Sequence, residues 1–276
     1  MRLTLDNKQV LLGTGSQSWA QMPTDDRAIV LVHGAGFDHS VWTGPARFFA
    51  RRLQAQGVRV IAPDLPAHGA SEGPALESVE AMAQWLHTLL QSLGISRVSV
   101  AGHSLGSLVA YEFAACYPQM CQQLVLLGTS NPMPVGGVLL GAAQDDHPAA
   151  FTMANTWSHI RAGGLGASAN PGMSNFLGDE RLLQRNLTGV YGADLQACNN
   201  YQPSATPLEV PTLLLAARQD KMTPARAGMK AVADFSQVEQ VVLEDCGHAM
   251  LNEKPNEVLD ALAEFMLPAF QGSNEG

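Results

Sequence analysis

The chain contains few charged residues, few aromatic residues and only four cysteines among its 276 positions. Charged side chains make up 15%, and 25 acidic residues outnumber 16 basic ones, which gives a formal net charge of −9. This balance argues against a nucleic-acid partner, because affinity for phosphate backbones comes from clustered Lys and Arg. Hydrophobic residues make up 46%, so the chain is not of a disordered type and can build a large core.

Long apolar runs are also absent. The longest stretch without a charged residue, 113–144, contains Pro118, Pro132 and Pro134, so it does not predict a helix that spans a membrane. The first twelve residues are too short and too polar for a signal peptide. The cysteines form no C-x-x-C pair and no metal-ligand spacing, which is typical of reduced thiols. We therefore expect a cytoplasmic protein without a membrane span or a bound metal.

Short, nearly continuous apolar runs recur along the chain and end in Gly, Asp or His. Such runs predict strands that are covered by helices on both faces, and two segments near the start predict a hairpin at the sheet edge. The predicted buried strands are 28–34, 59–65, 97–103, 123–129, 212–218 and 240–246, and the hairpin strands are 2–7 and 10–15. Together they predict an α/β fold with a mostly parallel, eight-stranded sheet.

Helical periodicity appears between the strands. Apolar residues share one face over 79–93, with Ser78 as a candidate N-cap and Gly94 as a stop, and Pro255 is placed for the first turn of a later helix. From 130 to 205 no strand is predicted, and 130–178 holds only three charged residues but eight glycines. We interpret 130–205 as a helical cap inserted into a core formed by 1–129 and 206–276.

The sequence Gly102-His103-Ser104-Leu105-Gly106 matches the pattern G-x-S-x-G. An apolar strand precedes it and a helical run follows, which is the arrangement of a nucleophile elbow. In such a turn the serine hydroxyl is lifted clear of the sheet, and the helix N-terminus favours developing negative charge. Ser104 is therefore the candidate nucleophile.

A serine hydroxyl needs a base, and the base needs an orienting acid. His248 lies directly after the last predicted strand, and Asp220 follows the strand before it. Since the ends of parallel strands meet at one sheet edge, both side chains can reach Ser104. Glu244 and Asp245 are rival acids, but they lie too close to His248 in sequence to approach its distal nitrogen easily.

Acyl transfer also requires hydrogen-bond donors for an oxyanion. The N–H of Leu105 is one candidate, and the loop after the strand 28–34 supplies the second, with Ala35 preferred to Gly36. We expect the substrate to contact apolar and polarisable side chains on the predicted cap and around the elbow. These candidates are Phe37, His103, Met133, Met153, Trp157, Met173 and Met222.

The chain resembles the α/β-hydrolase superfamily, in the group of small bacterial serine esterases. The segments that carry the resemblance are HGAG at 33–36, DLPAHGAS at 64–71, GHSLG at 102–106, RQDKMTP at 218–224 and CGHAM at 246–250. They occur in the family's order, as does the series Ser104, Asp220, His248. The chain departs from the family at Ala67 and Ser107, where glycine is common, so these positions bear on the shape of the pocket.

The resemblance implies a serine hydrolase that cleaves small to medium, mainly uncharged carboxylic esters through an acyl-enzyme, with a small-molecule substrate and no cofactor. The same residues would also support hydrolysis of carbon–carbon bonds, lactones, amides or thioesters, or perhydrolysis, because the fold does not choose among these reactions. A small-molecule receptor built on a hydrolase scaffold is the alternative from another class.

Overall fold

The computed structural model describes residues 1–160, 174–203 and 208–271 and contains one eight-stranded sheet with the order β1-β2-β4-β3-β5-β6-β7-β8. The pairs β1–β2 and β2–β4 are antiparallel, and all the other neighbouring pairs are parallel. This confirms the predicted sheet. The strands are β1 Arg2–Leu5, β2 Lys8–Gly13, β3 Arg27–Val32, β4 Arg59–Pro63, β5 Arg97–His103, β6 Cys121–Leu127, β7 Thr212–Ala217 and β8 Val238–Leu243.

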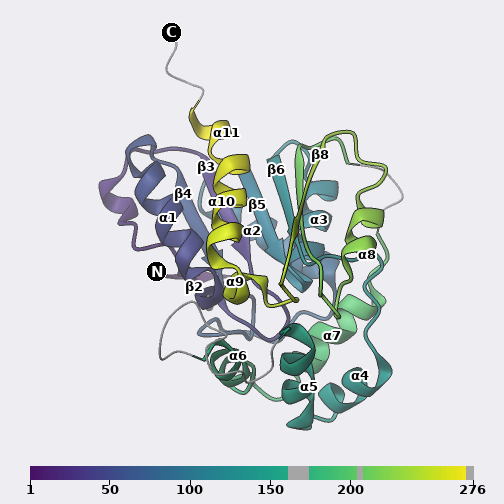
Figure 1. Cartoon of the computed structure of the whole chain (residues 1–276). Coiled ribbons are helices and arrows are strands. Elements are labelled where there is room, and N and C mark those ends of the chain that lie inside the picture. The colour runs from purple at the N-terminus through teal and green to yellow at the C-terminus, as the bar shows by residue number, and fades with distance from the viewer. Residues whose placement is uncertain (161–173, 204–207, 272–276) are drawn as a thin grey trace.

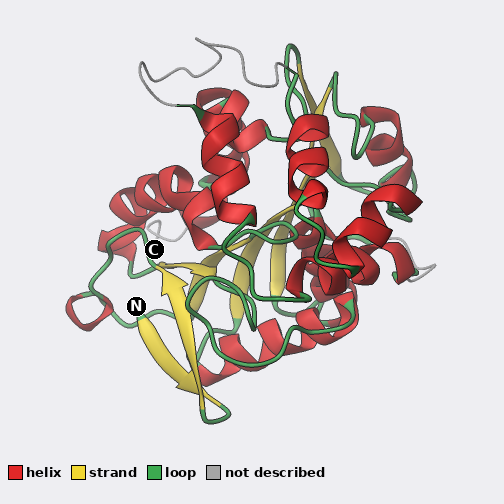
Figure 2. Cartoon of the chain, turned by 90° about the horizontal axis from the view of Figure 1, so that it is seen from below, coloured by secondary structure: helices red, strands yellow, loops and turns green. Residues whose placement is uncertain are grey.

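Helices cover both faces of the sheet (Figures 1 and 2). In β3, Ala28, Val30 and Val32 pack into one buried cluster, whereas Ile29 and Leu31 pack into a second cluster on the opposite face. This alternation explains the continuous apolar run, because successive side chains of a strand point to opposite faces. The first cluster includes residues of α2 (Val79–Ser92) and α3 (Leu105–Cys116), and the second includes residues of α1 (Thr43–Leu53) and α10 (Pro255–Met266).

The last strand differs from the expectation. The run 240–246 predicted a buried strand, but β8 begins at Val238, and its residues Glu239 and Gln240 are exposed. The reason is its position at the sheet edge, where β7 is its strand partner. An edge strand tolerates polar side chains because only part of its surface is covered. The shorter elements are η1 Trp19–Gln21, η2 His39–Trp42, η3 Gln54–Gln56, α8 Ala225–Ala231, α9 Met250–Glu253 and α11 Pro268–Gln271.

Four helices lie between β6 and β7 in the chain, and in the described part of this stretch there is no strand. They are α4 Gly137–Gln144, α5 Ala149–Ser158, α6 Asn175–Leu183 and α7 Val190–Asn200. In Figure 1 they gather beyond one end of the sheet. Their buried apolar side chains form a cluster of their own, which includes Leu139, Ala154 and Leu195. All four helices fall within the predicted cap, 130–205, and that division of the chain remains our interpretation.

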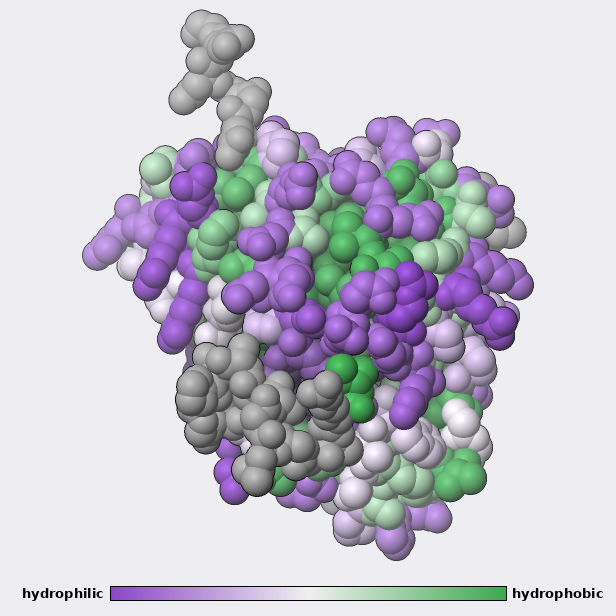
Figure 3. All heavy atoms as spheres, viewed as in Figure 1, coloured by the Kyte–Doolittle hydropathy of each residue, from purple (hydrophilic) through white to green (hydrophobic). Residues whose placement is uncertain are grey.

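The face seen in Figure 3 is largely hydrophilic, with apolar groups scattered between polar ones. Within the described residues, no helix combines the length and the apolar character that crossing a membrane requires.

Helix α2 begins as the sequence predicted. Ser78 is its N-cap, and the Ser78 hydroxyl accepts a hydrogen bond of 3.1 Å from the backbone N–H of Ala81. Gly94 follows the helix with a φ of +67°, a left-handed conformation that glycine adopts without strain.

We expect Ser78→Ala to lower the free energy of unfolding by about 1 kcal/mol, because it removes an N-cap acceptor. Denaturant unfolding of the purified protein measures the change. Ser18→Ala is the matched control: Ser18 precedes the short helix η1 but makes no side-chain capping bond. Equal losses in the two variants would contradict the capping role.

Candidate active site

Ser104 occupies the sharp turn between β5 and α3, with φ = 54° and ψ = −122°. This is a strained conformation for a residue with a side chain. A Cβ atom on Gly102 would collide with the carbonyl oxygen of Gly106, and one on Gly106 would lie 2.6 Å from the carbonyl oxygen of His33. The two flanking glycines are therefore required by close backbone contacts.

Ser107 stabilises the same turn. Its backbone N–H and its hydroxyl both donate to the carbonyl oxygen of Ser104, at 2.8 and 2.6 Å. The Ser104 N–H donates to Leu127 at the end of β6, at 2.9 Å. Ser107, one of the two positions at which the sequence departs from the expected family pattern, thus stabilises the turn. Sequence reasoning noted the departure but missed this contact.

His248 and Asp220 are paired. The Nδ1 atom of His248 lies 2.8 Å from Oδ2 of Asp220, and the two side chains are 6% and 0% exposed. Asp220 also accepts hydrogen bonds from the backbone N–H groups of Met222 and Thr223, and from the Thr223 hydroxyl at 2.7 Å. Burial alone would raise the pKa of Asp220, but the contact with His248 and these donors outweigh burial and lower it.

Thr223 is a residue that the sequence analysis missed. Its hydroxyl bridges the pair, since it lies 2.7 Å from Asp220 Oδ2 and 3.1 Å from His248 Nδ1. A threonine three residues after an aspartate that ends a strand was the available signal, because such side chains form local turns with the backbone.

His103, at the end of β5, holds the loop that carries His248 through a hydrogen bond to its backbone. Its Nε2 atom lies 2.9 Å from the carbonyl oxygen of His248, and a carbonyl only accepts, so the proton is on Nε2. Burial and the nearby His248 ring lower the pKa of His103 to about 3, which keeps it neutral. On the other side, a Cβ atom on Gly128 would lie 3.1 Å from the His248 ring, so this glycine leaves space for it.

Two pockets meet at Ser104, and Ala35, Leu195 and Met222 also line both of them. The first pocket is lined by His248 together with Phe37, His103, Asn155, Asp179 and Asn252. The second pocket is lined mostly by apolar residues, which include Met133, Val135, Leu139, Trp157 and Cys198.

Five of the seven predicted substrate contacts therefore line a pocket. Met153 lies on α5 and packs against the cluster formed by α4–α7, and it is not among the described residues that line either pocket. Met173 lies outside the described residues.

The first pocket has a polar wall, which differs from the apolar and polarisable contacts that we expected from the predicted cap. Asp179 is 5% exposed; its Oδ1 atom accepts from the side chain of Asn252 at 2.6 Å, and its Oδ2 atom lies 3.4 Å from Nε2 of His159. Burial lowers the pKa of His159, but Asp179 outweighs that effect and raises it. Asp179 lies directly after the sparsely charged stretch 130–178, which is why that composition was misleading.

The candidate oxyanion donors are backbone N–H groups, and they differ in whether a hydrogen bond within the protein already occupies them. Leu105 is the first residue of α3, directly after Ser104. The N–H of Gly36 donates to Oδ2 of Asp194 at 2.8 Å. Because that hydrogen bond occupies the Gly36 donor, the structure favours Ala35, which lines both pockets, as the second donor.

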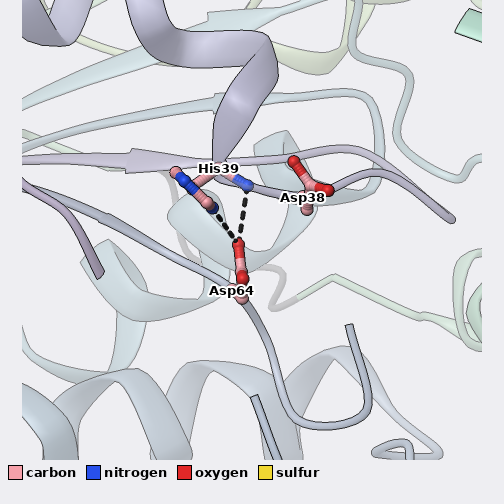
Figure 4. Close-up of side chains that lie close together, drawn as sticks. All are labelled: Asp38, His39 and Asp64. Atoms are coloured by element: carbon pink, nitrogen blue, oxygen red, sulfur yellow. Dashed lines mark hydrogen bonds and ion pairs between the residues drawn. The ribbon is translucent and has the colours of Figure 1, made fainter. Parts of the chain in front are cut away.

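Asp38, His39 and Asp64 form a cluster with metal-ligating side chains, whose potential ligand atoms lie within 4.8 Å of one another (Figure 4). Asp64 accepts hydrogen bonds from the backbone N–H of His39, from His39 Nδ1 at 2.6 Å, and from the backbone N–H of Ala70. The first two are the dashed lines in Figure 4. The hydrogen bond with Asp64 raises the pKa of His39. Because Asp64 is bonded to both His39 and Ala70, these contacts hold the 64–71 loop in place.

Comparison with known proteins places the chain in a family. The model of the alpha/beta hydrolase family matches residues 29–261. A 2-hydroxy-6-oxononadienedioate/2-hydroxy-6-oxononatrienedioate hydrolase from Burkholderia vietnamiensis is 28% identical over 243 residues, which cover 82% of each chain. The chain belongs to the alpha/beta hydrolase family.

Solved structures agree with this assignment of the fold. A thermophilic esterase from Thermogutta terrifontis superposes with a TM-score of 0.77 at 22% identity and covers 98% of this chain and 99% of its own. The enol-lactonase from Burkholderia xenovorans LB400 gives a TM-score of 0.81 at 17% identity, with coverage of 97% and 100%. The chain therefore has the fold of a hydrolase family whose members act on different bonds.

We expect Gly106→Ala to lower the free energy of unfolding by about 3 kcal/mol or more, since the added methyl group would collide with the backbone at the end of β3. Gly141→Ala is the matched control. It lies within α4 with open space around it and should be neutral or stabilising by up to about 1 kcal/mol. Denaturant unfolding compares the two, and a Gly106→Ala protein as stable as the control would refute the close-contact explanation.

Proposed function

We propose that the protein is a serine hydrolase that cleaves small to medium, mainly uncharged carboxylic esters. The observation that carries this proposal is the buried, hydrogen-bonded pair of Asp220 and His248, in which His248 lines the same pocket as Ser104. Ser104 would be the nucleophile, His248 the base and Asp220 the orienting acid. The turn conformation and the position of Ser104 ahead of α3 support this assignment.

The protonation of His248 follows from its partners. Asp220 is an ionised acceptor, so Nδ1 of His248 carries the proton that faces it, and the neutral ring then has its lone pair on Nε2. That lone pair would take the proton of Ser104 as the hydroxyl oxygen attacks the ester carbonyl. The negative charge of Asp220 would stabilise the imidazolium that forms.

The remaining steps release the alcohol and then hydrolyse the acyl-enzyme, and they use only water and the residues already named. The carbonyl oxygen becomes an oxyanion, which the N–H groups of Leu105 and Ala35 would hold, and its collapse breaks the bond to the alcohol, which leaves with the proton from His248. Water then attacks the acyl-enzyme while His248 takes one of its protons. This proton returns to Ser104 as the acid leaves, which restores the starting state.

The pockets support an uncharged ester as the substrate class. Two pockets that share Ser104 could separate the acyl and alcohol portions, and the second is mostly apolar. Apart from histidines, Lys221 in the second pocket is the one cationic residue among the described residues that line the two pockets, and the acidic Asp179 lines the first. A dianionic substrate such as a dioate would require more cationic partners.

We infer that residues 130–205 act as a cap that sets the preference for substrate size. The second pocket is lined from this segment by side chains that include Met133, Leu139, Trp157 and Leu195. Burying one methylene group of an acyl chain there would contribute about 0.8 kcal/mol. The value of kcat/KM should therefore rise with acyl length until the pocket is filled.

We expect Ser104→Ala to lower kcat toward a nitrophenyl ester by on the order of a thousandfold or more, because the nucleophile is lost. Ser18→Ala changes a serine that is not among the described residues lining either pocket, so this variant should keep the original rate. A fluorophosphonate probe should label the original protein and the control but not Ser104→Ala. Labelling without turnover of an ester and lactone panel would favour the receptor alternative, and a Ser104→Ala protein that keeps most of its rate would remove Ser104 from the mechanism.

We expect Trp157→Ala to shift the acyl length of highest kcat/KM toward longer chains, because it enlarges the second pocket. The control is Met153→Ala on the same helix, whose side chain packs outside both pockets. Rates on nitrophenyl esters from two to twelve carbons measure the preference. An unmoved optimum in Trp157→Ala would show that acyl chains bind elsewhere.

A further inference from the structure

We propose that Asp194, in helix α7, is a positioning residue for the oxyanion hole, and that it holds the 33–37 loop through Gly36 while a protonated His68 holds Asp194. The proposal rests on the proposed function, because it concerns the donor that Ala35 would supply. Asp194 lies outside the pairing of Asp220 and His248 and is fully buried.

Gly36 is held by hydrogen bonds on both sides of its backbone. The Gly36 N–H donates to Oδ2 of Asp194 at 2.8 Å, and the Gly36 carbonyl accepts from the side chain of Asn186 at 2.7 Å. Both polar groups of this residue are therefore held from the predicted cap. With a φ of +70°, Gly36 is in a left-handed conformation, and a Cβ atom there would lie 2.7 Å from the ring of Tyr191. The loop is thus fixed one residue after Ala35.

The contacts of His68 determine which of its ring nitrogens carry protons. Its Nδ1 atom lies 3.0 Å from the carbonyl oxygen of Pro66, and its Nε2 atom lies 2.8 Å from Oδ2 of Asp194. A carbonyl only accepts, and an ionised carboxylate only accepts, so both ring nitrogens must donate. Two donating nitrogens make the ring an imidazolium, and the contact with Asp194 is then a buried ion pair, with side chains 1% and 0% exposed.

One oxygen of Asp194 makes both contacts. Oδ2 accepts from Gly36 and from His68, whereas Oδ1 is buried and has no hydrogen-bond partner in the described structure. A buried carboxylate oxygen without a donor is costly. The positive charge of His68 offsets that cost. Without it, the negative charge of the buried Asp194 carboxylate would be uncompensated.

The neighbouring groups are consistent with a charged His68. Burial and the charge of His68 lower the pKa of His33, whose ring centroid lies 4.9 Å away, to about 4, so His33 is neutral. Burial raises the pKa values of Tyr191 and Cys198, which face Asp194 from α7 itself. The titratable groups packed around the pair are His33 after β3, Asp64 after β4, and Tyr191 and Cys198 in α7.

The pair predicts a pH dependence on the alkaline side. Burial would lower the pKa of His68, but Asp194 outweighs it and raises the pKa above its ordinary value of 6.5. The ion pair is therefore complete below this ordinary value and is lost as the pH rises through the raised pKa. Neutral His68 can donate from only one nitrogen, so the hold on Asp194 and Gly36 weakens there.

Two substitutions of Asp194 separate charge from hydrogen bonding. Asp194→Asn keeps an oxygen that can accept from Gly36 and His68, with its amide nitrogen in place of the unpartnered Oδ1, but removes the charge. Asp194→Ala removes the acceptor. Asp146→Asn is the matched control, since Asp146 also accepts from a backbone N–H in this segment, that of Gly189, but is exposed.

We expect Asp194→Ala to lower kcat on a nitrophenyl ester by about a hundredfold with little change in KM, as loss of an oxyanion donor does. Asp194→Asn should keep most of the rate at neutral pH and lose the alkaline decline that His68 causes. Asp146→Asn should match the original protein in both. Unchanged kcat in a folded Asp194→Ala protein, or the same alkaline decline in Asp194→Asn, would overturn the proposal.

A measurement that does not depend on catalysis tests the role of Asp194 separately from the role of Ser104. In the Ser104→Ala protein, NMR titration of the His68 ring should give a pKa above the ordinary value, and adding Asp194→Asn should lower it. In the same two proteins, the protection of the Gly36 N–H from hydrogen exchange, relative to its intrinsic exchange rate at each pH, should fall at alkaline pH when Asp194 is intact. If the Ser104→Ala protein keeps its activity, the proposed function alone is contradicted. If Asp194→Asn leaves the pKa of His68 unchanged, the positioning role alone is contradicted. Should Asp194→Ala fail to fold, Asp194→Asn and this titration decide the question.

Discussion

The site depends on one close contact, that of the turn at Ser104 with the end of β3. Gly106 approaches the carbonyl oxygens of Val32 and His33 so closely that no side chain fits. The same approach brings the loop that follows β3, with Ala35, next to the hydroxyl-bearing turn, since both line the two pockets. A close backbone contact thus places the candidate nucleophile and a candidate oxyanion donor side by side, before any side-chain chemistry is involved.

The parallel sheet supplies the rest of the geometry. The ends of β3, β5 and β7, together with the loop after β8, place Ala35, Ser104, Asp220 and His248 at one edge of the sheet. Residues far apart in sequence meet there because parallel strands deliver their carboxyl ends to the same side. Polar partners then fix each group. Asp220 accepts three hydrogen bonds besides its contact with His248, and its low pKa keeps it a carboxylate.

The sequence predicted those parts that local pattern determines. The sheet, the N-cap at Ser78 and the pairing of Asp220 with His248 follow from apolar runs, capping chemistry and chain order. Contacts between distant segments were not predictable in the same way. Nothing in the local sequence indicates that Asp194 reaches Gly36, 158 positions away, or that Asp179 forms a polar wall. Edge or interior placement of β8 likewise depends on sheet order rather than on its own residues.

The contacts of the predicted cap also change how its role is understood. A segment that only shaped the substrate pocket could be altered without effect on the chemistry. Here it is joined to two loops of the site: the backbone N–H of Ala249 donates to the carbonyl of Ser158, and Glu253 accepts from both Ile160 and Gly247 beside His248. On the opposite side, Gly36 is held from α7. Because the base loop and the oxyanion loop are both tied to this segment, a shift of its helices would move the groups that perform the reaction as well as the walls that select the substrate. Changes on the surface of the second pocket, such as that at Trp157, should therefore alter substrate preference alone, whereas changes at these tied positions should alter the rate for every substrate.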